Sequence, residues 1–353
     1  MSHLRACHLI YPSSEKICTP YSIGRNISII LSKTYNVQMY DWQSCNTIIP
    51  RDGDLLIGHS HPLPFTIFKN SLGQKLFSQR IMIQPFSTYL PHTSYILNIL
   101  PFVDKFLAIT ASFWEKSIKT SKFNKFSKKI FPINLGININ DFPFVKTYIK
   151  KPQNRKILYI GNKNPCKNID YLVQVAKKIG LSKFGSIGAV IPGFKNYGSL
   201  DFSKKESLDI IKEYDYLILL SYADACPTVV LEAMSWGLIP MTTQECGFVS
   251  NDGTNIIASN DCDAAVCQIK SILNYSLQCF KKIQRENLAI LKKDYSWTKF
   301  EKVLQKHIHE KKYIKGRYRK NNIKTIFNDL VVSGSFLRPA QFKAVFNAFI
   351  SNR

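Results

Sequence analysis

The first part of the chain alternates short apolar runs with longer amphipathic runs. Strand-like runs cover residues 4–11, 37–42, 54–59, 80–85 and 105–110, and helix-like runs cover residues 23–33, 65–77 and 113–126. Alternation of this kind is typical of βα units that build a parallel sheet. The pattern therefore predicts a doubly wound α/β domain.

A second series of runs follows a break at residues 142–154. This stretch is charged, contains Pro143 and Pro152 and has no firm periodicity, which indicates a linker. After it come strand-like runs at 156–160, 188–191, 214–221 and 239–242, and helix-like runs at 169–179 and 228–236. We expect a second doubly wound domain here. The pattern fades after Trp297.

Composition fits a globular chain with an unusual charge. The 353 residues suffice for two domains, and 45% hydrophobic with 20% charged residues excludes wholesale disorder. Lys and Arg number 48 against 24 Asp and Glu, which gives a formal net charge of +24. This charge predicts attraction to nucleic acid, anionic lipid or phosphorylated substrates. A general drift of the sequence toward Lys, Asn and Ile would produce it as well.

The cysteines and the apolar runs bear on the compartment. Nine cysteines occur without any Cys-x-x-Cys pair, so no zinc or disulfide framework is apparent and a reducing cytoplasm is expected. No uninterrupted apolar run reaches about 18 residues, so we expect no transmembrane span.

The stretch from Tyr214 to Thr243 carries the most informative chemistry. A strand at 216–220 runs into a loop at 221–227, and a helix begins near Thr228. Ligands of open α/β sheets bind at the carboxyl ends of strands, where a helix N-terminus suits a diphosphate. Asp224 in the loop and Glu232 about one turn into the helix could accept hydrogen bonds from sugar or ribose hydroxyls. They could equally be a loop acid and a helix-surface acid without a task.

This stretch resembles the retaining nucleotide-sugar glycosyltransferases of the GT-B fold, family 4. The family pattern is an acid, seven residues, Glu-Ala-Met, then Gly and Pro, and it is matched here by Asp224, Glu232-Ala233-Met234, Gly237 and Pro240. Weaker matches lie at residues 134–137, 160–170, 252–255 and 295–297. The resemblance implies two Rossmann-like domains facing across a cleft. We expect an acceptor-side domain at 1–145, a donor domain at 155–290, and a C-terminal helix with a basic extension at 291–353.

The resemblance also implies roles for single residues. Glu232 would bind the ribose hydroxyls of the donor, Asp224 would lie against the transferred sugar, and Lys167 would face the diphosphate. Further donor contacts are implied for Gly161, Lys163, Gly24 and the backbone N–H groups of Thr228 and Val229. No divalent metal or other cofactor is implied, because the helix dipole and the basic side chains would neutralise the diphosphate.

Two histidines extend the candidate site, and two departures from the family weaken it. His59 and His61 follow the strand-like run 54–59, so we expect both at the carboxyl edge of the first sheet as catalytic candidates. A His-x-His pair could also bind metal, but no third ligand is evident. The family's acceptor-side His, expected around residues 84–86, is absent, and Asp224 stands where the family mostly has Glu.

Two basic segments suggest an anionic surface as partner. From Phe113 to Phe131, six lysines alternate with aromatic residues, which favours an interfacial membrane element over a base-reading one. The alternative is a solvated helix whose aromatics pack on its own domain. From Lys306 to Lys324 the chain carries eight Lys or Arg and one acid, compatible with lipid head groups, nucleic acid or disorder.

Together these features predict a cytoplasmic, retaining hexosyltransferase on the inner face of the plasma membrane. It would transfer a sugar to a glycan or lipid-linked acceptor in envelope polysaccharide or glycolipid synthesis. One alternative is a degenerate GT-B protein that binds a sugar nucleotide or glycan without turnover. A nucleic-acid-binding protein is a further alternative, but the chain lacks any recognised motif for it.

Overall fold

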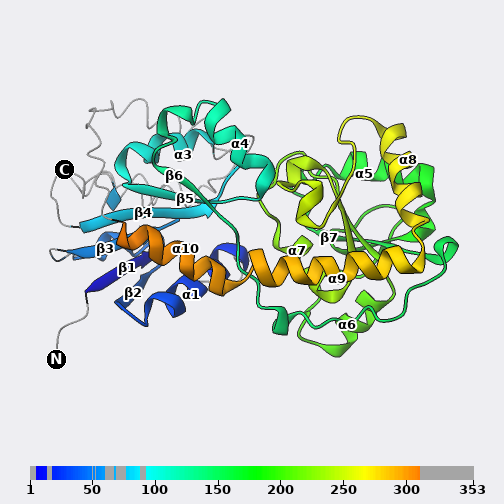
Figure 1. The fold of residues 1–353 in the computed structure, drawn as a ribbon, viewed down its shortest axis with the longest axis horizontal. Coiled ribbons are helices and arrows are strands. Elements are labelled where there is room, and N and C mark those ends of the chain that lie inside the picture. Colours follow the sequence, from blue (N-terminus) through cyan, green and yellow to red (C-terminus); the bar gives the residue numbers. More distant parts are fainter. Residues whose placement is uncertain are drawn as a thin grey trace. The chain divides into compact units, whose positions relative to one another are not determined.

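The computed structural model describes residues 5–13, 18–49, 51, 53–59, 67–68, 77–87 and 93–310. The chain forms two compact units that interleave along the sequence (Figure 1). Unit 1 contains Met1–Ala108, Ile118–Pro132 and Glu301–Arg353, and unit 2 contains Ile109–Ser117 and Ile133–Phe300. Among the described residues, no helix is long and apolar enough to cross a membrane.

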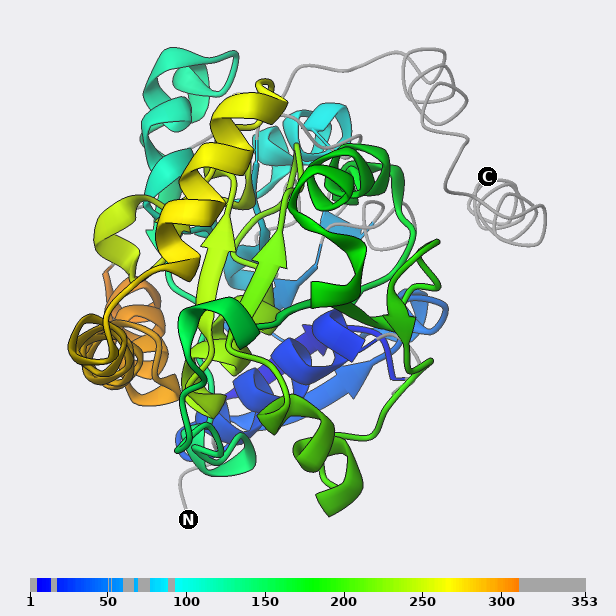
Figure 2. The ribbon, with the colours of Figure 1, turned by 90° about the vertical axis from the view of Figure 1, so that its right-hand side faces the viewer.

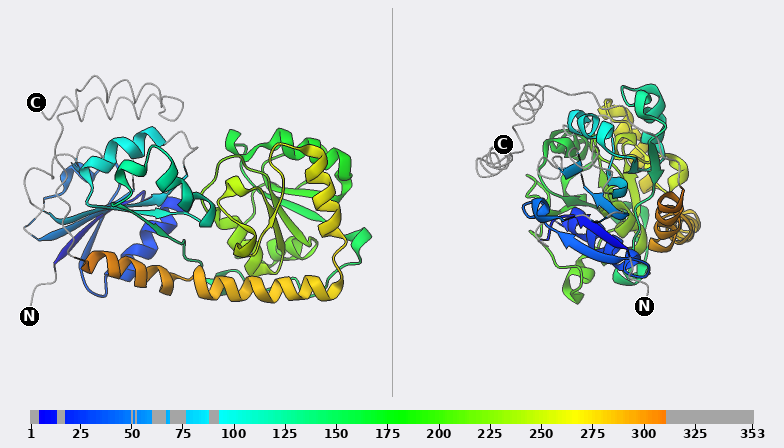
Figure 3. Two further views of the ribbon diagram at one scale, coloured as in Figure 1. Left: turned by 45° about the horizontal axis from the view of Figure 1, so that its top comes forward. Right: turned by 90° about the vertical axis from the view of Figure 1, so that its left-hand side faces the viewer.

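The sheet of unit 1 has six strands in the order β2-β1-β3-β4-β5-β6. Their bounds are β1 Ala6–Ile10, β2 Asn36–Tyr40, β3 Asp54–Gly58, β4 Phe77–Pro85, β5 Lys105–Ile109 and β6 Ile130–Ile133. Helix α3 (Thr93–Ile99) covers one face (Figures 1 and 3), and helix α4 (Ser112–Thr120) begins in unit 2 and ends in unit 1. The other face carries α1 (Cys18–Leu31) and the later part of α10 (Trp297–His309). An ion pair between Lys33, just after α1, and Glu301 on α10 (2.8 Å) joins the two helices.

The sheet of unit 2 also has six strands, in the order β12-β11-β10-β7-β8-β9. Their bounds are β7 Ile157–Gly161, β8 Phe184–Gly188, β9 Lys195–Asn196, β10 Tyr216–Leu219, β11 Ile239–Thr242 and β12 Asn255–Ile256. Helix α5 (Ile169–Ile179) packs with α8 (Cys262–Leu273), and α7 (Thr228–Trp236) packs with α9 (Leu277–Asp294). Helix α6 covers Lys205–Lys212. Figure 2 shows the strands of this sheet between α8 and α5, with α9 nearly end-on.

The doubly wound architecture predicted from the hydrophobic pattern is confirmed. Parallel pairing joins β1 to β2 and β3, and β7 to β8 and β10. Most predicted strands match the observed ones to within one or two residues, because fully buried apolar runs flanked by Gly or polar residues mark parallel strands well. The linker predicted at 142–154 contains only a short 3₁₀ turn at Pro152–Asn154.

Three predicted elements are wrong in part. The strand expected at 188–191 lies earlier, at Phe184–Gly188, because Gly188 has a left-handed φ of 88° and turns the chain. The helix expected at 65–77 cannot reach its end, since Phe77 already begins β4; residues 69–76 lie outside the described part. The basic helix expected at 113–126 stops at Thr120, and a separate 3₁₀ turn follows at Asn124–Phe126. Strands β6, β9 and β12 and helices α3, α6, α8 and α9 were not predicted.

Candidate active site

The candidate site of unit 2 lies where the sheet changes its direction of winding. Strands β7 and β10 are neighbours, but the chain runs from β7 through α5 to β8 on one side and from β10 through α7 to β11 on the other. The loops after the two strands therefore meet at the carboxyl edge, the switch point at which such sheets bind ligands. This topology brings together residues that are distant in sequence.

Lys167 and Asp224 form an ion pair at this edge. The Lys167 Nζ donates to Asp224 Oδ2 although 57 residues separate the two, and Asp224 Oδ1 accepts the N–H of Ala225 (2.9 Å). Burial lowers the pKa of Lys167, but the charge and the hydrogen bond of Asp224 outweigh it and hold that pKa above its ordinary value. Lys167 therefore keeps its proton, and the site contains an ion pair between the two side chains.

The loop that carries Asp224 is held by neighbours that the sequence did not indicate. The Trp114 indole Nε1 donates to the Asp224 carbonyl oxygen (2.6 Å), and the Asp224 N–H donates to the Glu245 carbonyl (2.8 Å). Trp114 is buried in unit 2 and precedes Asp224 by 110 residues, so no local pattern connects them. Cys226 has a left-handed φ of 57°, which is strained for a residue with a side chain.

Helix α7 starts four residues after Asp224 and contains Glu232. Thr228 is its first residue, and Glu232 follows one turn later on the same face of the helix. The Val230 N–H donates to the Pro227 carbonyl (3.1 Å), so the N–H groups of Thr228 and Val229 remain at the open start of the helix. Burial raises the pKa of Glu232 to about 7, although a hydrogen bond with the Thr228 side chain works against it. At neutral pH both the protonated and the ionised form of this carboxyl are therefore present.

Gly161 and Lys163 lie in and after the end of β7. A Cβ at Gly161 would lie 2.8 Å from the Tyr159 hydroxyl, which donates to the Asn162 carbonyl (2.8 Å). Glycine at this position is thus explained by local packing, and its role toward a donor stays a prediction. Lys163 is exposed in the loop that leads to Lys167.

The remaining predicted residues belong to unit 1. His59 follows β3, where its ring centroid lies 6.0 Å from that of Tyr11 and 5.8 Å from that of Trp42. Gly24 lies inside α1, and a Cβ there would come within 2.5 Å of the Tyr11 Cβ. The close packing of α1 on the end of β1 gives this glycine a structural reason too. His61 lies outside the described residues.

Among the described residues of the site, no cluster of metal ligands is evident, and the cysteine beneath the Asp224 loop is buried. In the described ranges, no group of three or more His, Cys, Asp or Glu side chains is placed to hold a metal ion. Cys246 lies under the loop and its Sγ donates to the Leu219 carbonyl (3.2 Å), and burial raises the pKa of its thiol to about 11. This cysteine packs as a small apolar residue.

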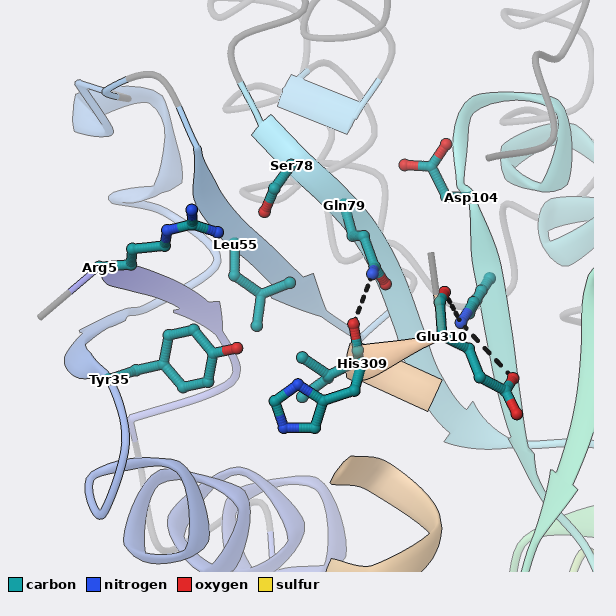
Figure 4. Close-up of a pocket in the computed structure, with 10 residues that line it drawn as sticks. Arg5, Tyr35, Leu55, Ser78, Gln79, Asp104, His309 and Glu310 are labelled. Atoms are coloured by element: carbon teal, nitrogen blue, oxygen red, sulfur yellow. Dashed lines mark hydrogen bonds and ion pairs between the residues drawn. The ribbon is translucent and has the colours of Figure 1, made fainter. Parts of the chain in front are cut away.

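A separate cavity of about 410 Å³ lies in unit 1 at the amino ends of its strands (Figure 4). It borders the end of α10, where Gln79 Nε2 donates to the Ile308 carbonyl (2.6 Å). Lys105 Nζ donates to the carbonyls of His307 and Glu310, the latter at 3.0 Å. These side chains of β4 and β5 bind the last carbonyls of α10. The cavity is at the opposite end of the strands from His59, so it does not extend the candidate site. Its side chains instead fix the end of α10.

Two six-stranded, doubly wound α/β units define the GT-B fold. The sequence matches no protein-family model and no curated protein. Solved structures share the fold, among them sucrose-phosphate synthase from Thermosynechococcus elongatus, with a TM-score of 0.67 and 12% identity over 87% of this chain and 98% of that one.

Two further solved structures with the same fold are a trehalose-6-phosphate synthase and TarM. A trehalose-6-phosphate synthase, studied for enzymatic glycosyltransfer with retention, gives a TM-score of 0.63 and 11% identity over 86% of this chain and 98% of that one. TarM from S. aureus, in complex with UDP, α-GlcNAc-glycerol and fondaparinux, gives a TM-score of 0.55 and 14% identity over 74% of this chain and 56% of that one. At these identities the likeness is one of fold.

Proposed function

We propose that the protein is a glycosyltransferase that moves a hexose from a nucleotide sugar to a glycan or lipid-linked acceptor with retention. The observation that carries this proposal is the Lys167–Asp224 pair at the switch point of a GT-B sheet, in the loop that leads into α7, the helix that contains Glu232. The TarM structure holds UDP, and the trehalose-6-phosphate synthase is described as retaining, which supports the same chemistry here.

Each residue has a physical task in the proposed reaction. Lys167 and the N–H groups of Thr228 and Val229 neutralise the diphosphate as it departs, and Lys163 adds charge at the entrance. The Glu232 carboxylate accepts hydrogen bonds from the ribose hydroxyls, and Asp224 lies beside the sugar where positive charge develops. Because the protein itself supplies the positive charge, we propose that no divalent metal is required. Donor turnover unchanged by EDTA is the expected result.

Nucleotide binding is the first test. Isothermal titration with UDP, GDP and ADP identifies the base. Glu232→Ala should lower the affinity for the tightest-binding nucleotide about 10- to 100-fold, since hydrogen bonds to a charged group contribute ~1.5–3 kcal/mol. Glu206→Ala, an exposed acid in the first turn of α6, is the matched control and should leave affinity unchanged. An unaltered affinity in folded Glu232→Ala would remove the assigned donor site.

A second candidate function is binding of a sugar nucleotide without turnover. The direct Lys167–Asp224 contact favours it, because the lysine neutralises the carboxylate that would have to act. Gln84 and Phe86, at the place of the family's acceptor-side His, are buried in unit 1. Nucleotide-sugar binding with neither hydrolysis nor transfer across a panel of acceptors would select this candidate.

We further propose that the enzyme works in the cytoplasm at an anionic membrane, in the synthesis of envelope polysaccharide or glycolipid. The support is the net charge of +24 and the exposed lysines between Phe113 and Phe131, whereas the basic segment Lys306–Lys324 lies outside the described residues beyond position 310. Flotation with vesicles tests the membrane contact, and the face that makes it is argued next.

A further inference from the structure

A groove with a cavity volume of about 720 Å³ lies between α9 and the segment at residues 144–147 in unit 2. One wall is α9, which contributes Leu277, Leu288, Lys281 and Arg285, and the other wall is the segment around Phe144. Helix α9 lies on the outside of its unit (Figures 2 and 3). The groove is thus distant in the fold from the carboxyl edge of the sheet, and the proposed transfer reaction does not use it.

The walls of this groove are fixed by buried contacts. Gln284 on α9 is buried, and its Nε2 donates to the carbonyls of Lys146 (3.1 Å) and Gly237 (2.7 Å). The Phe144 ring lies against Gly237, where a Cβ would come within 2.5 Å of the ring. Lys146 forms a buried ion pair with Asp215 (2.8 Å). The groove is therefore preformed.

Large apolar side chains are exposed on this face. Leu277 is 53% exposed and Phe144 is 39% exposed, and Tyr148, next to the wall residue Thr147, is 75% exposed. Apolar residues gathered in this way on a polar surface mark a site of interaction.

Basic residues lie beside these apolar side chains. Lys281 and Arg285 are one turn apart on α9 and both are exposed, while Lys282 is paired with Glu286 (3.8 Å). Among the described residues that line the groove, none is acidic. The face thus combines positive charge with accessible apolar surface, the combination by which proteins bind at an anionic membrane interface.

The basic segment from Phe113 to Phe131 lacks that combination. Its lysines at 116, 119, 122, 125 and 128 are exposed, but Trp114 and Phe123 are buried. The Phe123 ring packs edge-on against Phe86 with centroids 4.9 Å apart. Two of the aromatic residues that suggested a membrane element are thus core residues, and Phe113, Phe126 and Phe131 are half-buried. The segment exposes these lysines more fully than its aromatic rings.

We propose that the α9 groove docks on an anionic phospholipid bilayer. Leu277 and Phe144 enter the boundary between head groups and acyl chains, the groove takes up apolar lipid atoms, and Lys281 and Arg285 bind lipid phosphates. The proposal deepens the membrane setting of the proposed function, and it gives the contact one defined face.

Vesicle flotation with charge-reversed variants tests this face. Phosphatidylcholine vesicles are compared with vesicles of equal parts phosphatidylcholine and phosphatidylglycerol, at low and high salt. Binding should require phosphatidylglycerol and weaken with salt. The double variant Lys281→Glu/Arg285→Glu should bind at least about 25-fold more weakly, since each basic residue near such a surface contributes about fivefold. Lys122→Glu/Lys125→Glu has the same change in net charge and should bind within about twofold of the wild type.

A third variant tests the apolar part alone. Leu277 is the first residue of α9, where an acidic side chain suits the helix dipole, so Leu277→Asp should keep the fold and lose vesicle binding. Circular dichroism and nucleotide-induced thermal stabilisation check the fold of every variant.

Three outcomes would overturn the proposal. One is that the wild type binds neither kind of vesicle. Another is that the Lys122→Glu/Lys125→Glu variant loses binding while the α9 variants keep it. The third is that the α9 substitutions reduce retention of DNA or RNA and leave vesicle binding unchanged. Nucleotide binding and donor hydrolysis are measured without vesicles and do not involve the groove. Their failure counts against the proposed function, whereas failed flotation with intact nucleotide binding counts against the docking face alone.

Discussion

Glu232→Gln is the substitution whose consequences are most sharply defined by the structure. Glutamine has the shape of the protonated acid but cannot ionise, and the pKa of Glu232 is raised from 4.5 to about 7 because the side chain is buried. The change should therefore have opposite effects on the empty protein and on the complex. It should stabilise the first and weaken the second.

The effect on stability follows from linkage. A raised pKa means that folded Glu232 keeps a proton that the unfolded chain releases, so this residue costs stability as the pH rises from about 4.5 to about 7. At about 1.4 kcal/mol for each pH unit, the difference sets a ceiling of about 3 kcal/mol. Above pH 7 the glutamine variant should be more stable than the wild type by up to that amount, and near pH 4.5 the two should be equal.

The effect on binding has the opposite sign. If the ribose hydroxyls donate to the ionised carboxylate, only that form binds well, and with a pKa of about 7 about one tenth of it is present at pH 6 and about nine tenths at pH 8. Apparent nucleotide affinity should thus rise about tenfold between these pH values. Glu232→Gln should bind more weakly than the wild type at pH 8 and should lose this rise.

Urea unfolding and isothermal titration at pH 6, 7 and 8 measure both effects. The terminal phosphate of the nucleotide itself titrates near pH 6, and the glutamine variant supplies that background because it has no carboxyl at this position. The reasoning is refuted if the variant shows the same rise in affinity as the wild type, or if it is no more stable than the wild type at pH 8.

Four further substitutions probe the site and the anchor of α10. Lys167→Ala should weaken binding of the nucleoside diphosphate about 10- to 100-fold in titration. Its affinity for the nucleoside should be unchanged, because in the proposed site the lysine contacts only the phosphates. Asp224→Asn should bind the diphosphate more tightly, since it frees Lys167, yet abolish turnover in a donor-hydrolysis assay. Trp114→Phe keeps the ring but leaves the Asp224 carbonyl unpaired, a cost of ~1–3 kcal/mol that should appear as a 5- to 100-fold lower kcat with nucleotide affinity nearly unchanged. Lys105→Met should lower the free energy of unfolding by about 2 kcal/mol in urea, because buried carbonyls at the end of α10 lose their donor.

The hydrophobic pattern predicted the strands that build the site, and the reason is their burial. Residues 216–219 are fully buried, so an uninterrupted apolar run marks β10, and Gly237 with a left-handed φ of 89° ends α7 where the sequence predicts. The run at 188–191 misled because Ala189 and Ile191 are buried as well, although they belong to a turn. There the Ala189 N–H still donates to the carbonyl of Gly161 at the end of β7 (2.7 Å), but the left-handed φ of Gly188 has already turned the chain out of the strand.

Contacts between distant segments could not be read from periodicity. Trp114 is part of an amphipathic basic segment, and only the fold shows that its indole holds the Asp224 loop. Lys105 begins a buried strand, and its role at the end of α10 depends on His307 and Glu310, which follow it by 202 and 205 residues. Local patterns report which side of an element is buried, whereas these pairs depend on what buries it.

In the proposed reaction, the Lys167–Asp224 ion pair links the charge of Asp224 to the binding of the diphosphate. A diphosphate that takes Lys167 as its partner removes the counter-charge of Asp224 at the moment when the sugar arrives beside it. The carboxylate is then unpaired where positive charge develops on the sugar, so it stabilises the transition state more than the ground state. In the absence of a donor the same carboxylate is neutralised, which lowers the cost of keeping it partly buried. The shorter Asp in place of Glu fits this arrangement, because the lysine reaches it from the adjacent strand's loop. A site built in this way couples its reactive charge to occupancy of the diphosphate position.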